Sequence, residues 1–132
     1  MIVHESPYSV IVVNTANRLL ECAWRKDAGA LSEEEVIAEI TKVSDTVQAH
    51  NIQCILVDAT LYPFRDNMAL QKWINTQYMP FIVDCGVKRY AIVAQQMVRS
   101  NLESLEELIE DEESMEMRYF TQVEEAKNWL LS

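Results

Sequence analysis

Asp58 and Thr60 are the polar residues of this chain best placed for chemistry, because they follow the largely apolar segment Ile52–Val57. Such a segment, rich in β-branched residues, is typical of a buried parallel strand, and α/β proteins bind ligands at the carboxyl ends of such strands. There, a carboxylate and a hydroxyl either bind a ligand or end the strand by hydrogen bonding to the local backbone. The pattern leaves both interpretations open.

Aromatic residues gather close to the same predicted strand end. Tyr62 and Phe64 follow the strand, and Trp73 and Tyr78 lie in the helix that we expect after Asp66. They line an apolar pocket or pack helix against sheet, which is the commoner role of aromatic residues at helical spacing. The candidate binding residues are Asp58, Thr60, Tyr62, Phe64, Asp66, Asn67, Trp73 and Gln95.

Several kinds of catalytic and cofactor site are excluded by what the chain lacks. It contains only two glycines, Gly29 and Gly86, whereas phosphate-binding and dinucleotide-binding loops need several for close backbone approach. No Gly-x-Ser-x-Gly nucleophile motif is present. His4 and His50 have no Cys, Asp or Glu at a recognised ligand spacing, so we expect neither a metal nor another cofactor.

The charge of the chain restricts its partners. Eleven basic and twenty-one acidic residues give a net charge of −10, which repels nucleic acid and anionic membrane surfaces. We therefore expect no nucleic-acid and no membrane partner. The acidic run Glu103–Glu116 is interpreted as a solvated helix face and loop, with a docking site for a basic partner as the alternative.

Cysteine usage and the N-terminal residues favour the cytoplasm. Cys22, Cys54 and Cys85 are odd in number, widely spaced and set among apolar residues, as expected of small buried side chains in a reducing compartment. The N-terminus has no basic region followed by an apolar stretch, and no segment is long enough to span a bilayer.

Hydrophobic periodicity predicts alternating strands and helices after a frayed N-terminus. The predicted order is a hairpin of strands 9–13 and 18–24, a helix from 33 to near His50, strand 53–58, a helix after Asp66 that Pro80 kinks or ends, strand 88–94, an acidic helix from Ser100, strand 115–120 and helix 122–131. Capping boxes are predicted at Ser32 with Glu35, Ser100 with Glu103, and Thr121 with Glu124.

This order, β-β-α-β-α-β-α-β-α, predicts a mixed α/β fold. We expect a mostly parallel sheet of about five strands, with the hairpin at an antiparallel edge and about four helices. The chain shows no internal repeat or linker, so residues 1–132 are expected to form a single domain.

The chain resembles the STAS-like superfamily, domains related to anti-sigma factor antagonists and grouped loosely with Sec14-type folds. The resemblance rests on the hairpin ending near Trp24, strands 55–58 and 88–93, and the terminal segments 118–120 and 125–130. It implies a small single-domain STAS-like fold with a regulatory or protein-binding role.

The resemblance breaks down at one regulatory motif. In regulatory members of the superfamily, a turn of Asp-Ser-Ser-Gly type, which is phosphorylated on Ser or Thr, starts eight residues after the strand's aspartate. Here Asp66 matches, but Asn67, Met68 and Ala69 follow it and carry no hydroxyl. Thr60, six residues before Asp66, is a weak substitute, so the phosphorylation switch is not expected.

Three functional hypotheses remain. The first is a non-enzymatic protein-binding or regulatory module that uses the loop from Asp58 to Asp66 and the N-terminal turn of the helix that follows it. The alternative is a small-molecule or anion sensor, or a weak enzyme, with a pocket around Asp58, Thr60, Ala94 and Gln95. The third is a homodimer formed through strand 10–13 or through the face carrying Trp73.

Overall fold

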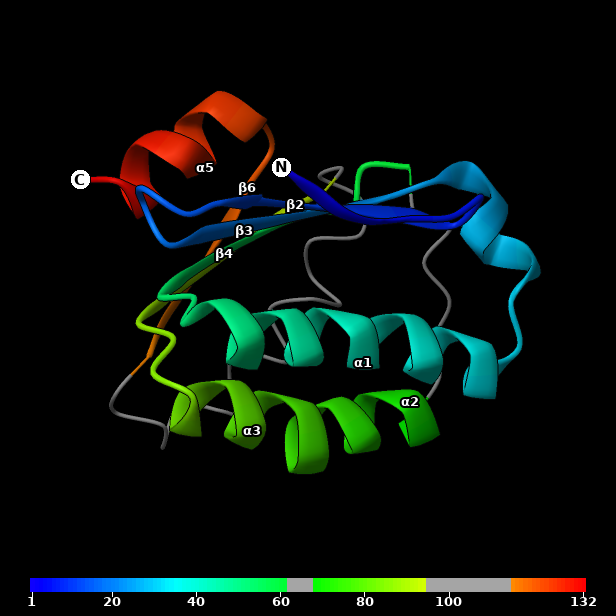
Figure 1. Cartoon of the computed structure of the whole chain (residues 1–132). Helices are drawn as coiled ribbons and strands as arrows, with labels where there is room; N and C mark the ends of the chain where they lie inside the picture. Colours follow the sequence, from blue (N-terminus) through cyan, green and yellow to red (C-terminus); the bar gives the residue numbers. More distant parts are fainter. Residues whose placement is uncertain (62–67, 95–114) are drawn as a thin grey trace.

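The chain folds around one six-stranded sheet, shown in a computed structural model that describes residues 1–61, 68–94 and 115–132 (Figure 1). The strands lie side by side in sequence order: β1 (Ile2–Glu5), β2 (Ser9–Asn14), β3 (Leu19–Trp24), β4 (Cys54–Asp58), β5 (Arg89–Val93) and β6 (Glu116–Phe120). The predicted helix from Ser100, its capping box and the acidic run up to residue 113 lie outside the described residues.

The sheet is mixed, as predicted. Strands β1, β2 and β3 pair antiparallel, and β3, β4, β5 and β6 pair parallel. The mixed α/β architecture with an N-terminal hairpin is therefore confirmed, with six strands where the sequence pattern predicts about five.

The additional strand is β1, in the segment expected to be frayed. Ile2 pairs with Val12 and His4 with Ile11, with a bulge between the two pairs. A four-residue strand at a sheet edge has too few residues to show a clear alternation, so its local sequence carries little signal. Its pairing with β2 and a contact to α1, described below, hold it in place.

Helix α1 (Glu33–His50) begins and ends where its sequence predicts. Ser32 Oγ accepts a hydrogen bond from the Glu35 amide at 3.2 Å, and Glu35 Oε1 accepts one from the Ser32 amide at 3.1 Å, which completes the capping box. Asn51 then adopts the left-handed conformation at φ 53°, and its amide donates to the Val47 carbonyl.

The second helical segment does not end before Pro80. It runs through α2 (Met68–Trp73), a π-helical turn η2 (Ile74–Tyr78) and α3 (Met79–Asp84). In the π turn the Met79 amide donates to the carbonyl of Ile74, five residues back. Pro80 then falls in the first turn of α3, where a missing amide hydrogen is tolerated, so the helix continues through it.

Helices lie on both faces of the sheet. Figure 1 shows α1, α2 and α3 on one face and the orange-red helix α5 (Val123–Leu130) on the other. The larger core fills the space under α1 to α3, and a smaller one, made with α5, comprises Leu19, Leu56, Ala91, Val93, Ala126 and Leu130. None of the helices in the described ranges combines the length and apolar composition that a membrane span requires.

The capping box predicted at Thr121 is wrong. Helix α5 begins at Val123, and its N-cap is Gln122, which makes no side-chain capping bond. A box formed by Thr121 and Glu124 needs a helical residue at 122, but Gln122 is extended, with φ −133° and ψ 138°.

Glu39 joins the N-terminal strands to α1 through a buried polar network. Its carboxylate accepts hydrogen bonds from Ser9 Oγ at 2.8 Å and Ser6 Oγ at 3.4 Å, and His4 Nε2 lies 3.1 Å from Oε2. Lys42 Nζ lies 3.7 Å from the other carboxylate oxygen. Glu39 is only 7% exposed, so these partners compensate for the loss of water around a charged group.

The same contacts lower the pKa of Glu39 below its ordinary value of 4.5. Burial by itself raises this pKa, but the hydrogen bonds from Ser9 and His4 and the charges of Lys42 and His4 outweigh it. Because the folded protein favours the ionised carboxylate, Glu39 stabilises the fold above pH 4.5, and this contribution is lost as the pH falls through the folded pKa.

We predict that Glu39→Gln lowers the free energy of unfolding by about 1–3 kcal/mol at neutral pH, because a charged acceptor is lost from a buried network. The difference from wild type should shrink as the pH falls below 4.5. Urea unfolding at a series of pH values measures it. The exposed Glu34→Gln on the same helix is the control, with little expected effect at any pH. A Glu39→Gln difference that stays constant or grows toward low pH would contradict the prediction.

Candidate functional site at the carboxyl end of β4

Asp58, the last residue of β4, makes a local turn with Thr60. Asp58 Oδ1 accepts a hydrogen bond from the Thr60 amide at 3.0 Å and another from Thr60 Oγ1 at 2.6 Å. This is the hydrogen bonding by which Asp side chains end strands and fix turns. The sequence leaves open whether Asp58 and Thr60 bind a ligand or hydrogen-bond locally. The structure shows the local hydrogen bonds.

Small buried residues close the sheet edge beside this turn. The Ala59 amide donates to the Val93 carbonyl at 2.7 Å, and the Ala94 amide donates to the Phe120 carbonyl at 3.0 Å. Both alanine side chains are buried. Leu61, in contrast, is 61% exposed immediately after Thr60. At the ends of β4 and β5, the described residues therefore include a hydrogen-bonded turn, two buried alanines and one exposed leucine.

The aromatic residues of the second helical segment pack against the sheet. Trp73 stacks on Tyr78 with ring centroids 6.4 Å apart, and Tyr78 meets Tyr90 of β5 edge to face at 6.5 Å. The hydroxyls of Tyr78 and Tyr90 are 3.3 Å apart. Burial raises the pKa of both tyrosines, and for Tyr78 the neighbouring Tyr90 raises it further. The rings therefore take the packing role and stay protonated at neutral pH.

Burial also suppresses the reactivity of the cysteines. It raises the pKa of the Cys22 thiol to about 12, with further contributions from the charges of Glu39 and Asp58. Burial raises the pKa of Cys54, against a lowering by Arg89, and that of Cys85, beside Asp84. All three are free thiols; Cys22 is buried as predicted, whereas Cys54 and Cys85 are only half-buried. A protonated thiol is a poor nucleophile and a poor metal ligand.

The structure brings together only part of the predicted site. Asp58 and Thr60 are in contact. Trp73 and Val57, however, pack against the larger core, whereas Asp58 lies two residues after Leu56 in β4 and so shares its face, the one covered by α5. The remaining candidates lie outside the described residues: Tyr62, Phe64, Asp66, Asn67 and Gln95. Within the described ranges, no group of three His, Cys, Asp or Glu side chains is arranged to hold a metal ion.

A second cluster of side chains, which is a further candidate for a binding surface, was not predicted from the sequence. Arg89 of β5 and Arg118 of β6 place their guanidinium carbons 5.4 Å and 5.1 Å from the ring centre of Trp129 in α5. Arg89 Nη1 also donates to the Trp129 carbonyl at 2.7 Å and to Ser132 Oγ at 2.9 Å. These contacts link two strands to a helix, so no local spacing in the sequence predicts them.

No family model, curated protein or solved structure matches this chain. The resemblance to the STAS-like superfamily therefore rests on the sequence segments given above.

We predict that Asp58→Ala destabilises the fold by about 1–2 kcal/mol, because the Thr60 amide and hydroxyl lose their acceptor. Asp58→Asn should cost less, since its amide oxygen still accepts both hydrogen bonds. Urea unfolding of the two variants and wild type measures the difference. An alanine variant as stable as wild type, or an asparagine variant as unstable as the alanine one, would show that this turn contributes no such stability.

Proposed function

We propose that this chain is a non-enzymatic protein-binding module of STAS-like type. Its docking surface is the turn Asp58–Leu61 at the carboxyl end of β4, called here the β4 turn. The module works without the phosphorylation switch of anti-sigma factor antagonists, since Asn67, Met68 and Ala69 carry no hydroxyl at the motif position.

The observation that carries this proposal is the exposure of Leu61 on a turn whose conformation is fixed by Asp58. A large apolar side chain in water favours a partner that covers it, although single exposed leucines are common. The two hydrogen bonds from Thr60 order the turn before any partner arrives. Such preorganisation lowers the entropic cost of docking.

The state of the reactive groups supports binding rather than catalysis. Cys22 and the tyrosine pair are buried and protonated, and one oxygen of Asp58 already accepts two hydrogen bonds. A general base or nucleophile needs an available lone pair near the reacting atom. The Cys22 thiol, the two tyrosine hydroxyls and Asp58 Oδ1 therefore serve the fold.

The packing of the same edge favours docking over a small-molecule or anion sensor. A sensor needs a concave site at the ends of β4 and β5, and in the described part of this edge the two residues after Asp58 and Val93, Ala59 and Ala94, are themselves buried. The exposed Leu61 suits a contact between two protein surfaces, where apolar side chains lie at the centre of the interface.

We predict that Leu61→Asp abolishes capture of the specific partner from native lysate, because it places a charge at the centre of the contact. Leu131→Asp is the matched control, since Leu131 is also exposed and the charge change is the same. Immobilised wild type and both variants, each checked for a wild-type melting curve, are compared by quantitative mass spectrometry of the retained proteins. The proposal requires a protein that wild type and Leu131→Asp retain and Leu61→Asp loses. Identical sets for all three would reject the β4 turn as the docking surface.

A further inference from the structure

Basic residues lie together at the opposite edge of the sheet, where the parallel strands begin. Arg18 directly precedes β3 and Lys88 directly precedes β5. The Gln53 amide donates to the Arg18 carbonyl at 2.9 Å, and the Lys88 amide donates to the Gln53 carbonyl at 2.7 Å. Arg18, Gln53 and Lys88 are therefore neighbours along this edge, and strand spacing places the two basic backbones roughly 10 Å apart.

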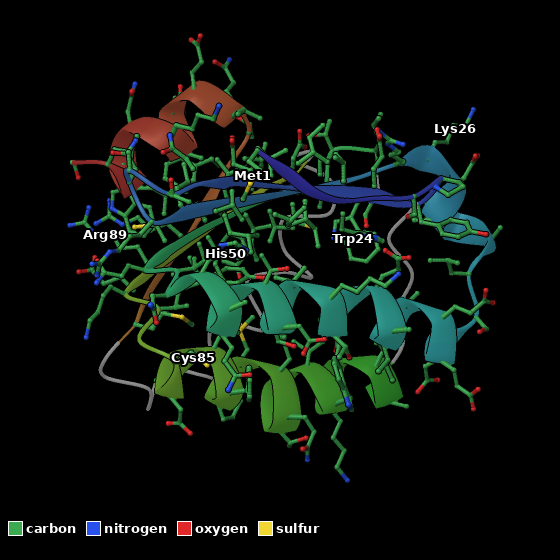
Figure 2. All side chains as sticks on the ribbon, in the orientation of Figure 1. Met1, Trp24, Lys26, His50, Cys85 and Arg89 are labelled. Carbon is green, nitrogen blue, oxygen red and sulfur yellow. The ribbon has the colours of Figure 1, made fainter. Side chains whose placement is uncertain are left out.

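The cluster of Arg89, Arg118 and Trp129 adjoins this edge. Arg89 is the first residue of β5, and Arg118 lies opposite Ala91, two residues farther along the neighbouring strands. Figure 2 shows Arg89 at the end of the molecule where the C-terminus lies in Figure 1, far from Lys26. We call Arg18, Lys88, Arg89, Arg118 and Trp129 the amino-edge surface.

This surface carries positive charge on a chain whose net charge is −10. Elsewhere Arg25 pairs with Glu5, Lys42 with Glu39, and Lys127 with Glu21. No ion pair joins Arg18, Lys88, Arg89 or Arg118 to another described side chain.

One acidic residue of the described strands also lies at this edge. Glu116 is exposed and stands opposite Arg89 in the strand register, but the two are not paired. Among the described strand residues at this edge, Glu21 is paired with Lys127, so the four basic residues outnumber the one acidic side chain left, that of Glu116. The described part of the amino edge therefore carries more basic than acidic side chains, and Trp129 contacts two of the basic ones, Arg89 and Arg118.

We infer that the amino-edge surface docks an acidic peptide segment of a different protein. Guanidinium groups bind carboxylates through two parallel hydrogen bonds, and Arg and Trp are the residues most enriched at the centres of protein interfaces. A peptide with a few carboxylates needs only a local match of charge. Nucleic acid carries a far denser charge, which the net charge of −10 repels, and the same charge repels a second copy of this chain.

The test is a fluorescence-anisotropy titration of the whole protein against a labelled peptide of four Leu-Glu-Glu repeats. A peptide of four Leu-Lys-Lys repeats and a labelled oligothymidine serve as the other probes. The acidic peptide should bind, and its affinity should weaken as salt is raised, because the contact is between exposed charges.

Charge-reversal variants locate the contact. Lys88→Glu and Arg118→Glu should each weaken peptide binding by about tenfold or more, since each replaces an attraction by a repulsion. Lys26→Glu and Lys72→Glu change the net charge equally at exposed positions away from this edge and should leave binding near the wild-type value. If Arg118→Glu fails to fold, the exposed Lys88→Glu, which lies outside the strands, gives the result.

Four results would overturn the inference. The first two are that the acidic peptide fails to bind at low salt, and that the Lys26 and Lys72 variants lose as much affinity for it as the Lys88 and Arg118 variants. The third is that oligothymidine binds more tightly than the peptide. The fourth is that sedimentation shows self-association that Arg118→Glu removes. If these results reject the amino-edge surface, the proposal that the β4 turn docks a protein still stands, because the two surfaces lie at opposite ends of the parallel strands.

Discussion

The order of the strands is the constraint on which the rest of this structure depends. Strands β3 to β6 are parallel and adjacent in sequence order, and right-handed crossovers between such neighbours carry their helices to the same face. Helices α1, α2 and α3 accordingly share one face, and α5 covers part of the other. Because β3 to β6 run parallel, their carboxyl ends lie at one edge, with the β4 turn, and their amino ends lie at the other, with the basic residues.

The sequence predicts the features that depend on local spacing. Ser32 and Glu35 stand at the separation of a capping box, and Asn51 suits the left-handed position after a helix, so both ends of α1 are found correctly. The buried strands β4 and β5 are found from their apolar runs. The sequence places Asp58 and Thr60 together after β4, and the structure shows the hydrogen bonds between them; their role as binding residues stays a prediction.

The features that sequence reasoning misses depend on contacts between distant parts of the chain. Strand β1 has too few residues for a pattern and is held by β2 and by the contact of His4 with Glu39 on α1. The extended backbone of Gln122 removes a capping box that spacing alone predicts. The contact of Arg118 with Trp129 joins β6 to α5 across a turn. A contact between a guanidinium group and an aromatic ring produces no periodic pattern in the sequence.

The most direct test of the central claim, that the carboxyl end of β4 docks a protein and holds no small molecule, is a crystal structure of protein purified from its native source without added ligand. We expect Asp58 Oδ1 to accept the Thr60 hydrogen bonds, with Ala59 and Ala94 buried and Leu61 open to solvent. A co-purified molecule in contact with Asp58 or Thr60 would contradict the account and establish a ligand pocket at this edge.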